Sequence, residues 1–349
     1  RIGLIMAYST IIKPNTNFTT RTYTATGAGS VSDVSFQPDF LWFKNRTVVG
    51  NHGLMDSVRG IKKILHSNDA TQEATSPANN DFETFTSNGF TYGTSSALDT
   101  GSGTPVTWLW KAGGTASSNT DGTITSSVSA NTTAGFSIVK YTGTGASATV
   151  GHGLGVAPKM IIGKGLGNAI NWTVGGSNIS SNWTSSLALN YTGAVNVANY
   201  WQDQAPNTNT FALSSDIGVN ASGLDFIAYC FSEVKGFSKF GSYVGNGSTD
   251  GTFIYTGFKP SWIMFKRSDG VQDWYMYDNK RNTYNPENLQ LDAMDSAAES
   301  TLLSGDFLSN GFKFRSLSSA FNTSGGTFIY MAFAENPFVT STGIPTPAR

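Results

Sequence analysis

The chain is poor in cysteine and in charge. Its 349 residues include one cysteine, Cys230, so no disulfide can form within the chain and stability must come from packing or association. Asp, Glu, Lys and Arg together make up 13% of the residues, about half the roughly 25% of an average domain. The formal net charge of −1 comes with no basic cluster, which argues against nucleic acid or an anionic membrane as the main partner.

Long apolar runs are also missing. No stretch approaches the roughly 18 apolar residues of a membrane span, and Arg1–Ile5 is too short for the core of a signal peptide. The three histidines, His52, His66 and His152, share no metal-ligand spacing with cysteine or carboxylates. We therefore expect no membrane insertion, no signal peptide, no metal site and no cofactor.

Glycine, serine, threonine and asparagine fill the polar positions instead. The chain has 39 glycines. Gly and Asn provide the positive φ angles of tight turns, and Ser and Thr are tolerated in strands. Turn signals recur about every eight to twelve residues, and few windows have helical character. This composition predicts an all-β fold of short strands joined by many turns.

One framework occurs three times along the chain. An aromatic strand runs into a glycine-rich turn, and a proline, a β-rich run and a terminal lysine follow. The proline blocks are Val34–Lys44, Val150–Lys164 and Gly251–Lys266, and their prolines lie roughly 120 and 100 residues apart. A repeat of this length indicates three domain-sized units rather than a short-period solenoid. Because the proline and lysine recur with the strand, we interpret them as scaffold.

Each unit also closes with an aromatic-rich strand, at Val106–Trp110, Phe226–Phe231 and Phe328–Phe333. Units one and three contain Ser-Asn-Gly between aromatic residues, at Phe85–Phe90 and Phe307–Phe312, which is a strong hairpin signal. Units of about 100 residues with six or more short strands predict three tandem degenerate β-sandwich or jelly-roll-like domains, each with a core of its own.

The predicted division of the chain follows from these blocks. An alternating strand at Gly122–Val128 makes the segment between units one and two a partly ordered connector, whereas units two and three adjoin and should pack tightly. In chain order the parts are an N-terminal arm with little core (1–20), unit one (21–111), the connector (112–133), unit two (134–236), unit three (237–338) and an extended tail (339–349).

Two Asp-x-x-Arg pairs follow equivalent strands, Asp56 with Arg59 and Asp278 with Arg281. A carboxylate and a guanidinium can make charge-assisted, directional hydrogen bonds to sugar hydroxyls. The commoner role of such a pair is a local ion pair that closes the strand end, and a surface pair contributes only about 0–1 kcal/mol. Unit two has neither residue.

Aromatic residues give the remaining binding candidates. Trp274 and Tyr275 face opposite sides of one strand, so one of them can be exposed as a platform for a sugar ring, although core packing is the commoner role. Trp201 and Asp203 lie in a variable stretch of unit two that combines an aromatic ring with a carboxylate. The candidate ligand-binding residues are therefore Asp56, Arg59, Trp201, Asp203, Trp274, Tyr275, Asp278 and Arg281.

No catalytic constellation is visible. Glycosidases need two carboxylates held about 5–10 Å apart. Asp269 with Asp273, and Asp292 with Asp295, are close in sequence, but they lie in polar, turn-like stretches with no feature that would raise one pKa. We expect a protein that is not an enzyme, and a capsule-degrading glycosidase is the least favoured alternative.

Four long segments carry a family resemblance: Ala134–Gly145, Val150–Ile162, Lys239–Gly247 and Gly326–Phe338. In them, and over nearly the whole chain, the sequence resembles tail and tail-fibre proteins of tailed bacteriophages, especially marine ones. The resemblance implies a structural protein on the virion surface, made in the host cytoplasm and bound to other virion proteins. Its usual role would be attachment to a host cell-surface glycan.

The resemblance also implies a homo-oligomer, with a trimer favoured because slender phage fibres usually close around a threefold axis. It supplies no ligand or catalytic residues. The alternative is an architectural virion component, such as a head-decorating or fibre-shaft protein, whose repeats pack on neighbouring subunits and bind no ligand.

Overall fold

The computed structural model describes residues 9–77, 81–94 and 103–337. Within them the chain forms antiparallel sheets, and helix is limited to single turns. The predicted all-β fold is therefore confirmed. The helical turns are η1 (Pro14–Thr16), η2 (Asn199–Trp201), α1 (Ile217–Asn220) and α2 (Ser319–Asn322).

The first repeat forms a six-stranded sheet, β1-β9-β3-β4-β5-β6, and a three-stranded sheet, β2-β8-β7, within the described residues. The predicted Ser-Asn-Gly hairpin is confirmed, because Phe85 pairs with Phe90. The strands are β1 (Phe18–Thr22), β2 (Gly29–Val31), β3 (Phe40–Asn45), β4 (Gly53–Asp56), β5 (Gly60–Leu65), β6 (Ala74–Thr75), β7 (Phe82–Thr86), β8 (Gly89–Tyr92) and β9 (Pro105–Trp110).

The second repeat forms an eight-stranded sheet, β10-β11-β12-β19-β14-β15-β16-β17, and a two-stranded sheet, β13-β18. Its strands are β10 (Ser117–Asn119), β11 (Ser126–Asn131), β12 (Phe136–Thr142), β13 (Ala148–Gly151), β14 (Met160–Gly165), β15 (Thr173–Gly176), β16 (Ser185–Ala188), β17 (Asn196–Val197), β18 (Thr210–Leu213) and β19 (Asp225–Phe231).

The third repeat forms one eight-stranded sheet, β20-β27-β22-β23-β24-β25-β26-β21. The second predicted hairpin is confirmed, because Phe307 pairs with Phe312. The strands are β20 (Ser238–Val244), β21 (Phe253–Tyr255), β22 (Phe258–Arg267), β23 (Tyr275–Asp278), β24 (Glu287–Asp292), β25 (Ser300–Leu308), β26 (Gly311–Phe314) and β27 (Thr327–Pro337).

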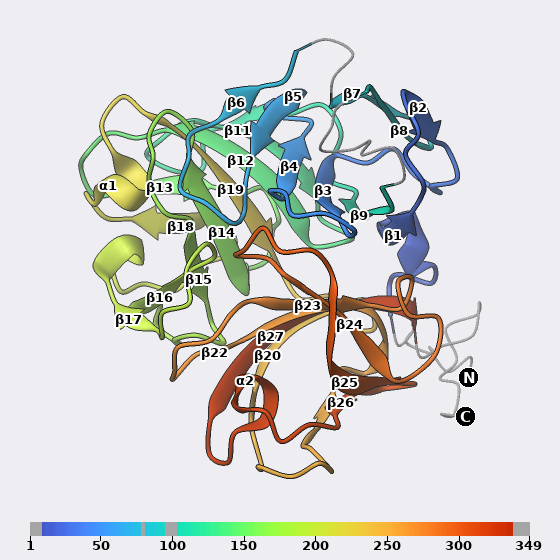
Figure 1. Cartoon of the computed structure of the whole chain (residues 1–349). Helices are drawn as coiled ribbons and strands as arrows, with labels where there is room; N and C mark the ends of the chain where they lie inside the picture. The colour runs from blue at the N-terminus through green and yellow to red at the C-terminus, as the bar shows by residue number, and fades with distance from the viewer. Residues whose placement is uncertain (1–8, 78–80, 95–102, 338–349) are drawn as a thin grey trace, which may run out of the picture.

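One strand order recurs in all three repeats. In each repeat the aromatic strand that opens the unit pairs with the closing strand. The closing strand pairs with the proline-block strand, and the next two strands follow in order. The three series are β1-β9-β3-β4-β5, β12-β19-β14-β15-β16 and β20-β27-β22-β23-β24. Figure 1 shows the repeats as three lobes, blue to teal, green to yellow and orange to red.

Side chains alternate between the two faces of each larger sheet. In β3, Phe40 and Trp42 face the centre of the molecule, whereas Leu41 and Phe43 face a separate outer core. The same alternation holds in β14 and β22. A period of two with apolar residues on both faces is expected of a strand covered on both sides. Each repeat is therefore sandwich-like, with a private outer core and a shared inner face.

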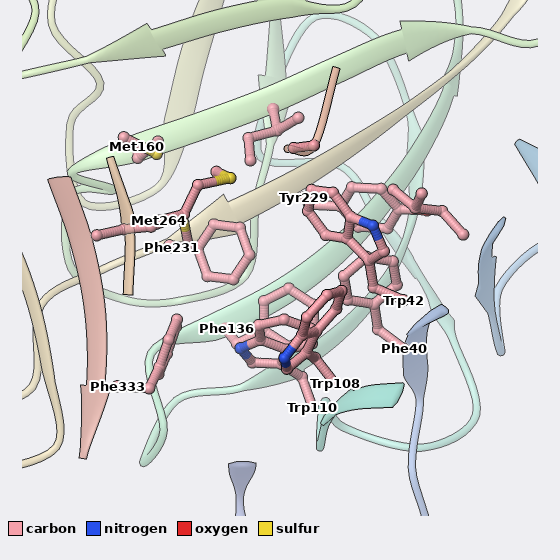
Figure 2. Packing of buried hydrophobic residues seen from close by; sticks show 14 of the residues in the cluster. Phe40, Trp42, Trp108, Trp110, Phe136, Met160, Tyr229, Phe231, Met264 and Phe333 are labelled. Atoms are coloured by element: carbon pink, nitrogen blue, oxygen red, sulfur yellow. The ribbon is translucent and has the colours of Figure 1, made fainter. Parts of the chain in front are cut away.

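The shared inner faces form one core between the three repeats. Trp110 of the first repeat, Phe231 of the second and Trp262 of the third all belong to this central cluster. Figure 2 shows residues of all three repeats packed together there. Burial of each such side chain stabilises the fold by about 1.5–3 kcal/mol. Each repeat thus has the core of its own that was expected, and it also shares an inner face that it would expose in isolation.

The ends of the predicted parts also differ from the structure. The arm assigned to residues 1–20 contributes buried Ile11 and Phe18, and Phe18 begins β1. The connector at 112–133 supplies β10 and β11 to the second sheet, because its Ser and Thr residues alternate with enough apolar ones to pair with β12. The first eight residues and the tail at 339–349 lie outside the described residues.

The terminal lysines of the three proline blocks lie at equivalent junctions between repeats. The amino groups of Lys44, Lys164 and Lys266 donate to backbone carbonyls of Ser296, Ala70 and Thr192 respectively. Each acceptor belongs to another repeat, in the order first to third, second to first and third to second. Burial lowers the pKa of each lysine to about 8. The three contacts close a ring, which gives the chain internal pseudo-threefold symmetry.

A second set of contacts has the same cyclic order. The ring nitrogens of His52, Trp172 and Trp274 bond to the carbonyl oxygens of Asp292, His66 and Ala188, at 3.1, 2.8 and 2.8 Å. His52 also accepts a hydrogen bond from Trp42 through Nδ1, so its Nε2 carries the proton that it donates. Burial, aided by Lys44, lowers the pKa of His52 well below its usual value, so this imidazole is neutral and structural.

Candidate functional site

The two Asp-x-x-Arg pairs lie inside the protein at the junctions between repeats. Arg59 Nε donates to Asp56 Oδ2 at 2.5 Å, with these side chains 1% and 0% exposed. The Tyr229 hydroxyl, from the second repeat, donates to the same carboxylate oxygen at 2.8 Å. The local ion pair expected at the strand end is therefore confirmed, whereas a surface position for it was wrong, because a neighbouring repeat covers the pair.

The pair in the third repeat has the same surroundings. Arg281 Nε donates to Asp278 Oδ2 at 2.6 Å, and neither side chain is exposed. Trp108 Nε1, from the first repeat, donates to Asp278 Oδ2 at 3.1 Å, and the guanidinium carbon lies 5.8 Å from the Trp108 ring centroid. The hydrogen-bonding groups of both pairs are thus used within the protein and are not offered to a sugar.

The third junction replaces this polar set with apolar residues. Gly176 and Ile179 of the second repeat stand where the others have Asp and Arg, and Met331 of the third stands where they have Trp108 or Tyr229. Ile179 and Met331 both belong to the central core. Packed apolar residues can replace a buried ion pair without loss of stability, which explains how the second repeat lacks both charges.

The aromatic candidates are also buried. Trp274 and Tyr275 are 1% and 5% exposed, and Trp201, which donates from Nε1 to Ser186 Oγ at 3.0 Å, is 2% exposed. The sheet is covered on both sides, so neither face of β23 presents an aromatic platform. Of the eight sequence-selected residues, only Asp203 is exposed. A binding surface therefore has to be sought elsewhere.

Two of the paired carboxylates of the third repeat, Asp273 and Asp292, have a raised pKa, which the sequence did not indicate. Burial, and then Asp295 and Asp273, raise the pKa of Asp292 to about 7. Gln290 holds the Asp292 carboxylate through contacts of 2.9 and 3.1 Å. These carboxylates line neither of the two hollows described below, and we assign them no catalytic role.

One position of the repeat is filled in the third copy and hollow in the other two. This position is the first residue of β4, β15 and β23, and it is occupied by Gly53, Thr173 and Tyr275 respectively. The Tyr275 ring packs 4.7 Å from the Phe321 ring and fills the third copy. Hollows of about 430 Å³ and 250 Å³ adjoin the equivalent strands of the first and second repeats. We call them the first-repeat cavity and the second-repeat pocket.

The second-repeat pocket is formed at the ends of β15 and β16 and by the loop that follows β16. None of its lining residues, all within the described part of the chain, carries a charge; they combine aromatic rings, amides and a hydroxyl with small apolar groups. They are Asn171, Trp172, Thr173, Leu187, Ala188, Tyr191, Gly193, Ala194, Asn196 and Tyr200.

Tyr191 is the exposed aromatic residue of this pocket, with 62% of its surface accessible. The edge of its ring lies beside Gly193, where a Cβ would stand 2.7 Å from Tyr191 Cε1. Glycine at 193 therefore leaves room for the ring. Sequence comparison of the repeats offers one signal for this residue, since the equivalent positions are Asp69 and Asp295.

The loop that carries Tyr191 is held by the third repeat. Thr192 O accepts hydrogen bonds from Lys266 Nζ at 2.8 Å and from the Gln272 amide at 3.0 Å. The Val195 amide donates to Ser268 O at 2.7 Å. These bonds fix the loop before any ligand arrives, which lowers the entropy that binding would otherwise cost.

The lining of the pocket also offers hydrogen-bonding groups. Asn190 Nδ2 donates to Asn171 Oδ1 at 2.9 Å, and Asn190 Oδ1 accepts from the Trp172 amide. Among the described residues, no protein acceptor bonds the Asn171 amide nitrogen, so its donors are available to a ligand. A fixed aromatic face beside free amide donors suits a polyhydroxylated ring.

The first-repeat cavity is larger and has an apolar floor with a polar edge. His66 and Asp81 are its titratable lining residues besides the buried His52. It is lined by Phe43, Asn51, His52, Gly53, Met55, Ile64, His66, Ala74, Thr75, Ser76, Pro77, Asp81 and Phe82.

In the part of the chain that the structure describes, no cluster of His, Cys, Asp and Glu suits a metal ion, and no helix is long and apolar enough to cross a membrane.

Comparisons with known proteins place the chain in a family. No curated protein and no solved structure matches the chain. A family model described as "Domain of unknown function (DUF7483)" matches residues 13–337, so the chain belongs to the DUF7483 family.

Proposed function

We propose that the protein is a bacteriophage virion structural protein, a tail-fibre or tail-tip component that attaches to a neutral glycan on the host surface. The virion setting rests on the resemblance of its four long segments to tail and tail-fibre proteins. The glycan rests on the second-repeat pocket, whose exposed Tyr191 ring is the observation that carries the binding role.

The pocket suits a neutral sugar on three counts. A pyranose ring has an apolar face of C–H groups that can cover an exposed aromatic ring. The amides of Asn171 and Asn196 and the hydroxyl of Thr173 match sugar hydroxyls. None of the described lining residues is a Lys or Arg that would attract a carboxylate or sulfate. The pocket is small, which favours one sugar unit of a longer chain.

Binding without catalysis fits the same residues. An uncharged pocket holds no general acid or base for hydrolysis of a glycosidic bond. The protein on this proposal is not an enzyme, needs no cofactor and acts together with other virion proteins. Homotrimer formation stays a prediction from the resemblance.

A glycan array tests the binding role. The full-length protein should bind neutral glycans in preference to sialylated, uronic or sulfated ones. Tyr191→Ala should weaken the best interaction by about tenfold or more, which corresponds to about 1.4 kcal/mol. Tyr284→Ala is the matched control, because Tyr284 is 83% exposed in the third repeat and does not line the pocket.

The architectural alternative predicts a different result. Its supporting observation is the set of cyclic contacts, which makes the chain a rigid block suited to packing in a particle. If the protein binds no glycan and no host cells at micromolar concentration, and particles that lack it lose stability rather than adsorption, the architectural role replaces attachment.

A further inference from the structure

We propose that the first-repeat cavity is a second carbohydrate site, which takes the N-acetyl group of a neutral amino sugar. This inference rests on the proposed glycan-binding function and assigns a ligand to a different repeat. The cavity, of about 430 Å³, is within the range of about 300–1,000 Å³ of small-ligand sites and adjoins β4.

The floor of the cavity is apolar. Phe43, Met55 and Phe82 belong to the outer core of the first repeat and line the cavity, together with Ile64. A hexose alone presents hydroxyls on nearly every carbon, and burying them here without partners would cost free energy. An acetyl methyl group can pack against this apolar floor without burying a hydroxyl.

The edge of the cavity offers hydrogen-bond acceptors. His66 Nδ1 donates to the His52 carbonyl at 2.6 Å, so Nε2 is the ring nitrogen left for a ligand. Asp81 Oδ2 accepts from Ser76 Oγ at 2.6 Å, and among the described residues no protein donor bonds Asp81 Oδ1. The Asp81 carboxylate can accept hydrogen bonds from a ligand, and the amide N–H and the hydroxyls of an N-acetylated sugar supply such donors.

Charge excludes the acidic sugars. Among the described lining residues there is Asp81 and no Lys or Arg, so a sialic or uronic carboxylate would meet repulsion with no compensating cation from them. An unacetylated amino sugar would bring an ammonium group to the apolar floor, where desolvation is costly. The neutral acetamide avoids both penalties.

The backbone does not require the glycine that opens the cavity. Gly53 is not among the residues with positive φ, and a Cβ built there would lie 3.5 Å from Met55 Sδ and 3.6 Å from Phe43 Cδ1, which is ordinary contact. The third repeat places Tyr275 at this position and is filled. The space in the first repeat is thus set by the choice of side chain, and a larger side chain should close it without disturbing the sheet.

Titration calorimetry of the full chain tests the proposal with N-acetylglucosamine, glucose and glucuronic acid as probes. N-acetylglucosamine should bind at least tenfold more tightly than either of the others. Gly53→Leu should remove this preference and leave the melting temperature close to that of the wild type. Ala74→Trp is the second variant, because Ala74 is exposed at the rim and can be enlarged without entering the core.

Tyr191→Ala separates this site from the second-repeat pocket. It should leave the acetyl preference intact. The second site is overturned if the protein binds glucose and N-acetylglucosamine with equal affinity. It is also overturned if the preference for N-acetylglucosamine survives both Gly53→Leu and Ala74→Trp. Glycan binding through Tyr191 would stand in either case. Absence of all sugar binding overturns the proposed function as well.

Discussion

Removing Arg59 alone should destabilise the protein more than replacing Arg59 together with Asp56 and Tyr229. Arg59→Met would leave the fully buried Asp56 carboxylate with the Tyr229 hydroxyl and two backbone amides, at 2.8, 3.0 and 2.8 Å, but with no opposite charge beside it. Breaking one partner of a buried pair costs about 3–5 kcal/mol. We expect a loss of that size in the free energy of unfolding.

The chain contains its own template for the compensated variant. Gly176, Ile179 and Met331 occupy the equivalent positions at the junction between the second and third repeats. The triple variant Asp56→Gly, Arg59→Ile, Tyr229→Met copies them. It leaves no unpaired charge, so it should be more stable than Arg59→Met despite three changes.

Urea unfolding followed by tryptophan fluorescence measures both variants, because all three repeats contribute tryptophans to the shared core. Arg267→Met is the control. Its partner Asp269 lies 2.6 Å away at the surface, and the loss should stay within about 1 kcal/mol. The reasoning is refuted if Arg59→Met is as stable as the control, or if the triple variant is less stable than Arg59→Met.

Three further predictions concern single residues. Lys164→Met removes the amino group that bonds the Ala70 carbonyl in another repeat and should lower the melting temperature. An unchanged melting temperature in calorimetry would show that this hydrogen bond between repeats does not stabilise the fold. Burial raises the pKa of Glu287 to about 8, above its unfolded value, so its favourable contribution is complete at about pH 4 and disappears as the pH rises through 8. Glu287→Gln should therefore stabilise the protein at pH 9 and not at pH 4, and equal melting shifts at both values would contradict this. Gly193→Ala should displace the Tyr191 ring and weaken glycan binding without unfolding the protein, as the array and a melting curve together would show.

The framework of the fold could be predicted from the sequence because strand, turn and proline recur in each copy. The prolines and terminal lysines were correctly interpreted as scaffold, and Lys44, Lys164 and Lys266 indeed bond between repeats. Alternation of apolar residues predicted strands, and Ser-Asn-Gly between aromatics predicted both hairpins. These are local signals that each repeat carries by itself.

The closure of the repeats into a ring could not be predicted in the same way. Asp56 and Arg59 read as surface residues because their cover, Tyr229, comes from far along the chain. Tyr191 was missed because its one signal, a tyrosine where the other repeats have Asp69 and Asp295, becomes visible only when the loops of the three repeats are aligned. Its exposure depends on a loop held by Lys266 of another repeat. Contacts between repeats thus decide which candidates are buried and which are free.

A crystal structure of the full chain with the neutral oligosaccharide that binds best on the array tests the central claim most directly. The attachment role predicts one sugar ring in the second-repeat pocket, with its apolar face against the Tyr191 ring and its hydroxyls near the Asn171 amide. A sugar bound elsewhere, with both of these side chains free of contact, would contradict it.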